Sequence, residues 1–466
     1  MPMSSRTLSL STYRTREDFS ILLLLVWIVS FLFSQPAKAS QTDTYIFDPN
    51  QSNVVKTGGF VGVHETYSII GQFRLSVDYD AGFASFDKVN ANLIDQKGSM
   101  YNGNLGDVFN MTALLGTIVE DTTIRFQGKT NDGTDSDVLL TLDIEDDSAH
   151  LTGTITPPAN SADMFSFELD AVASRKFGGG SGEPNNPYLI YTVDQMNAFG
   201  AEPNEWDKHF KLMTNIDLSG FLYDIALIAP VTISDDNDPI QGTPFTGVFD
   251  GNGHTISNLT VMGEGYLGLF GRVTSKAKIV DLGVVDVNIV GSGDYVGGLV
   301  GFNEYGQLNR CFSSGQVSSG TGIGGLVGYN GFGGRVLRCY STSAVTGQKN
   351  IGGLVGLNDG EISQCYSIGP VTGIDTNGLG IGGLVGYGGT VNQSFWDIET
   401  SGQIASKGGM GMTTAAMQMV RTFLKAGWDF VDEIENGMED VWWIDEGNDY
   451  PRLTWELAKD DSMGSD

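Results

Sequence analysis

One short phrase recurs through the second half of the chain and limits what the chain can fold into. The strong copies, Val/Ile-Gly-Gly-Leu-Val-Gly, start 27, 28 and 30 residues apart, at Val296, Ile323, Ile351 and Ile381. Two weaker copies start at Tyr266 and Phe245, which gives six units. Self-similarity at this period is typical of repeat proteins, in which each unit buries an apolar face against the next.

The residue types favour a β-repeat over a helical one. Two adjacent glycines in every phrase would cost a helix about 1 kcal/mol each, and the units are rich in Val, Ile, Ser and Thr. A second pattern follows each phrase, a pair of residues three positions apart: Ile256/Leu259, Ile279/Leu282, Leu308/Cys311, Val336/Cys339, Ile362/Cys365 and Val391/Ser394. Both members can face a core only if the chain turns a corner between them. We therefore expect a parallel β-helix.

Stacking of coils about 4.8 Å apart places like residues in columns. We predict one column of thiols and one ladder of amides that bond along the axis: Cys311, Cys339 and Cys365, and Asn303, Asn330 and Asn358. Gly388 replaces the amide in the last copy, so the ladder should end there. The thiols fit small apolar fillers best, with one disulfide or a metal site as alternatives.

The phrase resembles the GLUG repeat, named for its Gly-Leu-any-Gly core. This chain has that core at Gly298-Leu299-Val300-Gly301 and in three later copies, and Cys-Phe/Tyr-Ser follows at Cys311, Cys339 and Cys365. The resemblance implies a right-handed β-helix in a secreted or surface-attached bacterial protein, adhesins and one class of immunoglobulin-cleaving peptidases among them. It supplies no active site.

Composition and the first residues indicate export. Three arginines precede an apolar run from Phe19 to Phe33, and Ala37-Lys38-Ala39 has the small-x-small pattern of a signal-peptide cleavage site. The run is short of the roughly 20 residues that span a bilayer, so we expect no membrane insertion after cleavage. A formal charge of −30 argues against nucleic acid and anionic membranes as partners.

Ahead of the repeats, alternating segments such as Phe73 to Tyr79 and Val138 to Ile144 predict about eight strands in an antiparallel β-sandwich or barrel. A Gly-rich stretch around Phe177 to Gly182 marks the boundary. The fold class is thus all-β, a right-handed parallel β-helix preceded by an antiparallel domain. The expected parts are 1–39 (signal peptide), 40–174 (sandwich or barrel), 175–182 (linker), 183–244 (N-terminal cap and first coils), 245–396 (repeats) and 397–466 (C-terminal cap).

Both ends of a β-helix need covers, because open ends expose strand edges and core. A short helix from Thr192 to Gly200, with the strand around Phe210 to Leu212, should cover the first coil. One helix from Thr413 to Gly427, followed by Trp428, Trp442 and Trp443, should plug the last coil, with a ligand-binding aromatic patch as the alternative.

Catalytic signatures are weak. His64-Glu65 lacks the second histidine of a zinc peptidase, and no Gly-x-Ser-x-Gly elbow occurs. Polysaccharide lyases and hydrolases use acids on the outside of such folds, and six acids lie near the first coils: Asp235, Asp236, Asp238, Asp250, Asp281 and Asp286. Turn formation explains them equally well, no EF-hand spacing occurs, and Ca²⁺ stays an unsupported option. We predict no catalytic or metal residues.

If the thiol column faces inward, alternation turns the next residues outward as an aromatic stripe, formed by Phe312, Tyr340, Tyr366 and Phe395. The stripe could stack on sugar rings of a polysaccharide or on cell-surface components, or it could only stiffen the solenoid. The sequence favours an exported, non-enzymatic protein with adhesive, scaffolding or glycan-binding work. The alternative is a carbohydrate-active enzyme.

Overall fold

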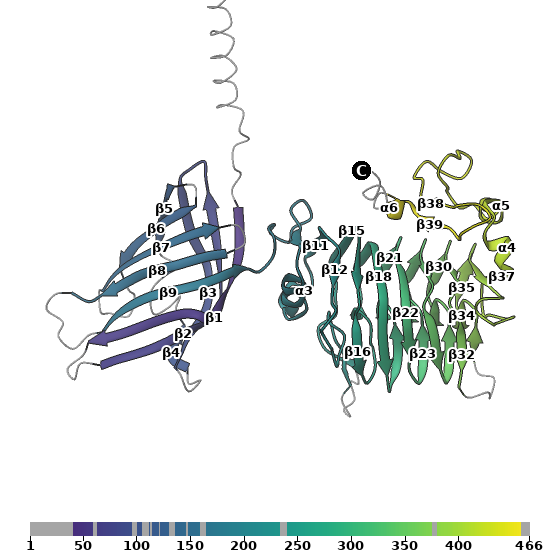
Figure 1. Ribbon diagram of the computed structural model, residues 1–466, viewed down its shortest axis with the longest axis horizontal. Helices are drawn as coiled ribbons and strands as arrows, with labels where there is room; N and C mark the ends of the chain where they lie inside the picture. The colour runs from purple at the N-terminus through teal and green to yellow at the C-terminus, as the bar shows by residue number, and fades with distance from the viewer. Residues whose placement is uncertain are drawn as a thin grey trace, which may run out of the picture.

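The computed structural model describes residues 41–457, with gaps at 59–62, 96–99, 105–110, 112–113, 121, 130–135, 146–147, 159–164, 234–239 and 375–379. The expected signal peptide and the loop acids Asp235, Asp236 and Asp238 therefore lie outside the described residues. A strand-rich body at the N-terminal end precedes a long solenoid, and the C-terminal segment runs along one side of that solenoid (Figure 1). The all-β prediction is confirmed.

The N-terminal body is an antiparallel sheet of nine strands, eight of which close into a ring. Closure follows from the pairing order β1-β2-β3-β5-β6-β7-β8-β9, because β9 also pairs with β1, and β4 adds to the side of β3. Of the two expected forms, the barrel is the one found. The strands are β1 (Gln41–Gly58), β2 (Val63–Asp78), β3 (Phe83–Asp95), β4 (Met100–Asn104), β5 (Leu115–Glu120), β6 (Thr123–Lys129), β7 (Asp137–Glu145), β8 (Ser148–Thr156) and β9 (Phe165–Arg175).

Alternation of buried and more exposed residues, broken at a few bulges, fills the barrel. In β6 the side chains of Ile124 and Phe126 are buried, while their neighbours are partly or fully exposed. Phe73, Phe86 and Phe126 form the centre, with ring centroids 5.5 Å apart for the first pair and 4.4 Å for the second. The apolar faces of the eight ring strands therefore point to one enclosed core.

The rest of the chain forms a parallel β-solenoid of about five turns. Its longest sheet contains β10 (Tyr188–Ile190), β11 (His209–Leu212), β12 (Ile216–Asp217), β15 (Val248–Ser257), β16 (Thr260–Gly263), β18 (Lys278–Gly291), β21 (Gln307–Asn309), β22 (Phe312–Ser318), β25 (Arg335–Leu337), β26 (Tyr340–Ser341), β27 (Ala344–Gly347), β30 (Glu361–Ser363), β31 (Tyr366–Ser367), β32 (Val371–Gly373), β35 (Thr390–Asn392), β36 (Phe395–Asp397) and β37 (Met410–Met412). A second sheet contains β17 (Phe270–Val273), β20 (Val300–Asn303), β24 (Val327–Asn330), β29 (Val355–Asn358) and β34 (Val385–Tyr387). A third contains β19 (Asp294–Gly297), β23 (Thr321–Gly324), β28 (Lys349–Gly352) and β33 (Ile381–Gly382).

The remaining elements are short. They are the strand pairs β13 (Thr232–Ile233) with β14 (Ile240–Gln241) and β38 (Trp442–Trp443) with β39 (Arg452–Leu453), the 3₁₀ turn η2 (Pro203–Glu205), and the helices α3 (Val193–Gly200), α4 (Thr414–Met417), α5 (Val420–Leu424) and α6 (Thr454–Leu457). Among the described residues, no helix has the length and apolar character needed to cross a bilayer.

Each repeated phrase is a corner between two sheets. Strand β28 ends at Gly352 and β29 starts at Val355, so Ile351, Leu354 and Val355 are all fully buried although their parities differ. The pairs three residues apart are corners too. Leu308 and Cys311 both face the core, and Arg310 between them has a φ of +55°. A left-handed residue stands at the same corner in four other coils: Asp281, Arg338, Gln364 and Gln393.

Two assignments near the first coils are wrong. Phe249 pairs with Ile279, so the weak copy at Phe245 belongs to the second pattern and not to the phrase. Ile228 pairs with Phe270, so it occupies the position of the repeated phrase in the coil that contains Phe249. Ile256 pairs with Val284 and not with Ile279, the partner that the second pattern predicts. The bulge between Asp250 and His254 shifts this coil out of register with those that follow.

The predicted thiol column is present. Each cysteine is fully buried, and the Sγ of one coil accepts a hydrogen bond from the backbone N–H of the coil before it, at 3.4 Å from Cys311 to Cys339 and at 3.3 Å from Cys339 to Cys365. The hydroxyl of Ser394 continues the column at 3.1 Å. The three thiols are free, and burial raises the pKa of Cys311 and Cys339.

The predicted amide ladder is also present. The Nδ2 of Asn303 donates to Asn330 Oδ1, and the Nδ2 of Asn330 donates to Asn358 Oδ1, both at 2.8 Å. Asn358 then donates to the Thr390 carbonyl, because Gly388 has no side-chain amide that could accept the bond.

Replacing Asn330 by alanine should lower the free energy of unfolding by about 2–3 kcal/mol, since buried amides on both sides lose a partner. Chemical denaturation would measure the loss, with exposed Asn392→Ala as the matched control. A loss no larger than that of the control would show that the ladder does not stabilise the coils.

The N-terminal end of the solenoid is covered as predicted. Thr192 caps α3 by accepting from the Gln195 N–H, and Phe199 packs on Phe210 with ring centroids 3.9 Å apart. Gly200 is the last helical residue and not a stop signal. A Cβ there would lie 2.6 Å from the Leu227 carbonyl oxygen, so the close approach to Leu227 explains the glycine.

The C-terminal end differs from the prediction in two ways. The expected single helix is split into α4 and α5, with Met419 extended between them. Met417 and Phe423 are both buried in one cluster, and six residues of unbroken helix would point them about 120° apart. Residues 413–457, called the strap below, also do not plug the last coil. They run back along the side of the solenoid toward its first coils (Figure 1).

Candidate functional site

The predicted aromatic stripe exists, but it is covered. Phe312, Tyr340 and Tyr366 stack with ring centroids 4.9 Å apart and planes within 8° of parallel. The stripe faces away from the thiol column, as alternation requires. Its four side chains are nevertheless at most 8% exposed, because the strap lies on them. The stripe is thus a core between solenoid and strap, and the hypothesis that it offers a free surface to a ligand needs correction.

The strap holds the stripe through rings and phenols. Trp455 stacks on Phe312 at 5.6 Å, and Trp442 lies 6.1 Å from Tyr366. Tyr340 Oη donates to Glu456 at 2.9 Å, and Tyr366 Oη donates to the Pro451 carbonyl at 2.5 Å. Burial raises the pKa of both tyrosines, so they remain neutral donors.

The acids near the first coils are occupied in ion pairs and turns. Asp281 accepts two hydrogen bonds from Arg310, at 2.5 and 2.7 Å. Asp250 lies 3.2 Å from Lys211 and accepts the Asn252 N–H at 2.8 Å. Both acids line a groove of about 590 Å³ between the coils and the strap. No group of three carboxyl, imidazole or thiol side chains suited to a metal occurs in the part of the chain that the structure describes.

A second set of aromatic side chains lies outside the strap, on the second and third sheets. The residue directly after each Gly-Leu-Val-Gly is Phe302, Tyr329, Leu357 or Tyr387, and these four pair in register from strand to strand. Phe302 and Tyr329 stack at 4.9 Å with planes 6° apart, while Tyr387 is 53% exposed.

Two tyrosines from the preceding corner join this set. Tyr295 lies 5.1 Å from Tyr329, and Tyr266 lies 5.2 Å from Tyr295. We call Tyr266, Tyr295, Phe302, Tyr329 and Tyr387 the aromatic face. Tyr266 and Phe302 are buried at its base, at 8% and 7% exposed, so Tyr295, Tyr329 and Tyr387 form its accessible part. An exposed edge-to-face pair, Tyr305 and Phe332, stands on the loops that follow β20 and β24.

The backbone of the aromatic face is strained. Tyr266 and Tyr295 have φ values of +57° and +62°, a region that bulky residues rarely adopt. The equivalent residues of the next three coils are Gly322, Asn350 and Gly380, which tolerate this conformation. Tyrosine is therefore kept at two corners where the fold itself prefers Gly or Asn. Strain of this kind, about 1–3 kcal/mol per residue, is found most often at functional sites.

Carboxylates border the aromatic face. Tyr329 Oη donates to Asp359 at 2.7 Å, and Arg272 over Phe302 is paired with Glu304 at 2.8 Å. Burial raises the pKa of Tyr295, and Asp294 and Asp359 raise it further. Burial and then the bond to Asp359 likewise raise the pKa of Tyr329. The phenols stay neutral, and the acidic border disfavours a polyanion.

A pocket of about 360 Å³ extends the aromatic face toward the first coil. Its walls are apolar at Ile225, Val231 and Met262, and Asp224 and Glu264 supply carboxylates. Val231 also packs in the cluster of Tyr266 and Phe302, so pocket and face are continuous. A concave apolar site with a few polar groups is the usual form of a ligand site.

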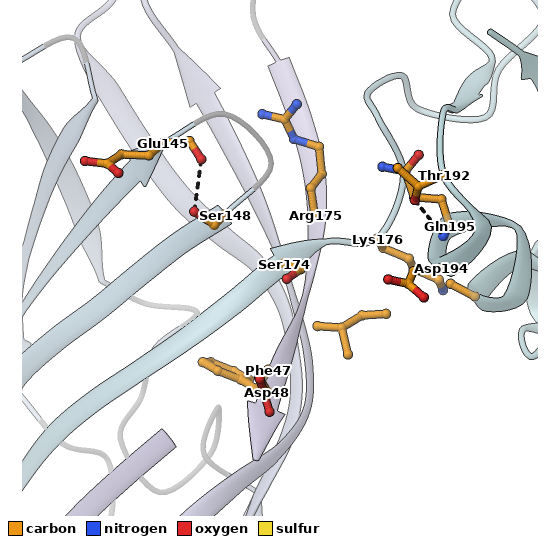
Figure 2. Close-up of a pocket in the computed structure, with 12 residues that line it drawn as sticks. Phe47, Asp48, Glu145, Ser148, Ser174, Arg175, Lys176, Thr192, Asp194 and Gln195 are labelled. Carbon is orange, nitrogen blue, oxygen red and sulfur yellow. Dashed lines mark hydrogen bonds between the residues drawn. The ribbon is translucent and has the colours of Figure 1, made fainter. Parts of the chain in front are cut away.

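A further cleft, of about 650 Å³, lies between the barrel and α3. Glu145 and Ser148 stand on its barrel wall, and Thr192, Asp194 and Gln195 on its helix wall (Figure 2). Lys176 between them is committed to Glu202 at 2.9 Å; burial raises the pKa of Glu202, but this bond and others outweigh it and hold the pKa low. The polar groups of the two walls belong to different elements and form no common constellation, so we rank the aromatic face above this cleft.

The predicted site residues fall into two groups. The thiols and amides are buried within the solenoid, and the stripe is buried under the strap. The aromatic face was not predicted. A signal for it was present, since Phe302, Tyr329 and Tyr387 follow three of the four strong phrases directly.

Together these features define an all-β protein in which a closed barrel precedes a parallel β-solenoid with an aromatic outer face. No family model matches the chain. Over 179 residues, 37% of its length, the chain is 34% identical to halomucin of Haloquadratum walsbyi. Over 98 residues, 20% of its length, it is 35% identical to a "Gly-rich membrane protein" of Evansella cellulosilytica. The chain spans only 2% and 10% of the length of these two relatives.

Proposed function

We propose that this chain is a non-enzymatic extracellular surface protein of the GLUG-repeat type that adheres to neutral polysaccharide through its aromatic face. The similarity to halomucin and to a membrane protein supports a place at the cell surface. Export of the chain, with a signal peptide at 1–39, is part of the same proposal.

The strained tyrosines carry the proposal. A fold that needed only a corner at Tyr266 and Tyr295 would gain stability from Gly or Asn there, as in the next three coils. Retaining tyrosine instead keeps apolar rings with hydroxyl edges beside a pocket. Such rings suit the C–H faces and hydroxyls of sugars, and Asp294 and Asp359 can accept from those hydroxyls. Among the described acids of the first coils, Asp250 and Asp281 are paired with Lys211 and Arg310, which argues against their use as catalytic carboxylates.

Replacing Tyr295 by asparagine tests the proposal, because it separates binding from stability. The variant should melt at the same temperature or higher, as the substitution relieves about 1 kcal/mol of left-handed strain. Its retention on immobilised neutral polysaccharides, chosen from a glycan array with the wild-type chain, should fall at least about tenfold, since the ring bridges Tyr266 and Tyr329.

The matched control is Tyr191→Asn, at a half-exposed tyrosine beside α3. It should leave retention unchanged. A Tyr295→Asn chain that is folded and retained as well as the wild type would refute binding at the aromatic face.

A further inference from the structure

The strap contains an acidic loop that the proposed function does not use. Residues 429–440 lie between α5 and β38, and half of them are acidic: Asp429, Asp432, Glu433, Glu435, Glu439 and Asp440. No lysine or arginine occurs among these twelve residues. Acidic residues on a surface loop are by themselves no reason to expect a ligand.

Two buried oxygens in this loop are independent evidence for a ligand. Asp429 is 6% exposed, and its Oδ1 is buried without a hydrogen-bond partner among the described residues. The Oε1 of Glu433 is buried and without a partner in the same way. A buried carboxylate oxygen with nothing to accept from is costly, and native proteins almost always supply a proton donor, water or cation.

Backbone N–H groups of the loop hold one oxygen of each carboxylate. Asp429 Oδ2 accepts the Glu439 N–H at 2.9 Å, and a Cβ at Gly437 would lie only 2.2 Å from this oxygen. Glu433 Oε2 accepts the N–H groups of Glu435 and Asn436, at 2.8 and 3.1 Å. In each side chain, backbone N–H groups bond one oxygen, and the other oxygen is available to a ligand. Such outer bonds are what orient the carboxylate ligands of metal ions.

We propose that the loop 429–440 binds one calcium ion through Asp429 Oδ1 and Glu433 Oε1. Calcium takes six to eight oxygen ligands in flexible geometry and accepts backbone carbonyls and water beside carboxylates. That flexibility fits a loop that offers two buried carboxylate oxygens without a protein donor, and in which no group of three potential side-chain ligands occurs among the described residues. Magnesium demands near-octahedral geometry and fits it less well.

Calcium would tie together the parts of the strap that hold the stripe. Asp429 directly follows Trp428, and the Asp429 carbonyl accepts the N–H of Trp442 at 3.0 Å. Both tryptophans pack on the stripe. A cation at this loop would therefore stabilise the strap on the solenoid, independently of any saccharide at the aromatic face.

The test uses the exported chain, residues 40–466, stripped with EGTA and titrated with CaCl₂ by isothermal calorimetry. One site with a dissociation constant of about 10⁻⁴–10⁻³ M is expected, as in extracellular calcium modules. Saturating Ca²⁺ should also raise the melting temperature by about 2–4 °C. Asp429→Asn and Glu433→Gln should each weaken Ca²⁺ binding at least tenfold, and MgCl₂ should give no comparable shift.

In EGTA, Asp429→Asn should be at least as stable as the wild type, because it removes a buried charge and keeps the acceptor for the Glu439 N–H. Loss of the calcium response would then not reflect unfolding. Asp194→Asn, an exposed acid at α3, is the control and should respond like the wild type. Calcium-independent melting of the wild-type chain, or wild-type affinity in both loop variants, overturns the proposal.

Discussion

Replacing Gly353 by alanine should prevent the solenoid from closing the phrase corner that starts at Ile351. A Cβ at Gly353 would lie 2.2 Å from the Gly383 carbonyl oxygen of the next coil and 2.9 Å from Ser367 Oγ. The carbonyl is backbone and cannot rotate away, so two coils would have to separate. We expect a loss of about 4 kcal/mol or more in the free energy of unfolding, measured by guanidinium denaturation.

The matched control is Gly320→Ala, in a loop of the same solenoid. Its Cβ would meet no atom closer than 3.6 Å, and its φ is not left-handed. This variant should unfold within about 0.5 kcal/mol of the wild type. Equal stabilities of the two variants would mean that the coils are not packed as closely as the corner at Gly353 requires.

Replacing Trp442 by alanine should detach the strap. Trp442 is fully buried, 4.6 Å from the ring of Trp428 and 6.1 Å from that of Tyr366. Truncating a buried tryptophan costs about 3–5 kcal/mol, because the apolar contacts are lost and a cavity remains. The strap should then become sensitive to limited proteolysis within 413–457, while the coils remain resistant because their backbone bonds do not involve it.

The neighbouring residue supplies the control. Trp443 is only partly buried, on the opposite side of β38, so Trp443→Ala should cost clearly less and leave the strap protected. Cleavage of both variants at the same rate, or of neither, would contradict the assignment of the strap as a cover held by the stripe.

The coils could be predicted from the sequence because the same packing requirements recur in every coil. A pair such as Leu308 and Cys311 allows both side chains inside only if the residue between them turns, and Arg310 does so in the left-handed region. The amides of Asn303, Asn330 and Asn358 recur once per coil, and stacking leaves them one set of partners. Repetition therefore determined both the corners and the columns.

The non-repeated parts could not be predicted in the same way. The strap meets the stripe through contacts between residues more than 100 positions apart, such as Tyr340 with Glu456. Local helix propensity gave one helix where burial of both Met417 and Phe423 requires two. The bulge after Asp250 changes the register of this coil relative to the next one, and the spacing of the later repeats does not predict it.

The aromatic face was missed for a related reason. The stripe follows from the alternation of side chains beyond Cys311, Cys339 and Cys365, and the structure has this alternation. What the sequence does not reveal is which outward column stays open, because that depends on where the strap lies. The column outside the strap contains Leu357 between Tyr329 and Tyr387, and this interruption weakens its pattern.

The stacking of equivalent residues once per coil is the claim on which the rest depends, and distances between spin labels test it most directly. Lys278, Gln307, Arg335, Glu361 and Thr390 form one column of the long sheet. Labels at Lys278 and Thr390 should lie about 19 Å apart, and labels at Lys278 and Glu361 about 14 Å apart, one coil spacing less. Longer distances, or a difference between the two pairs that is not one strand spacing, would contradict the solenoid.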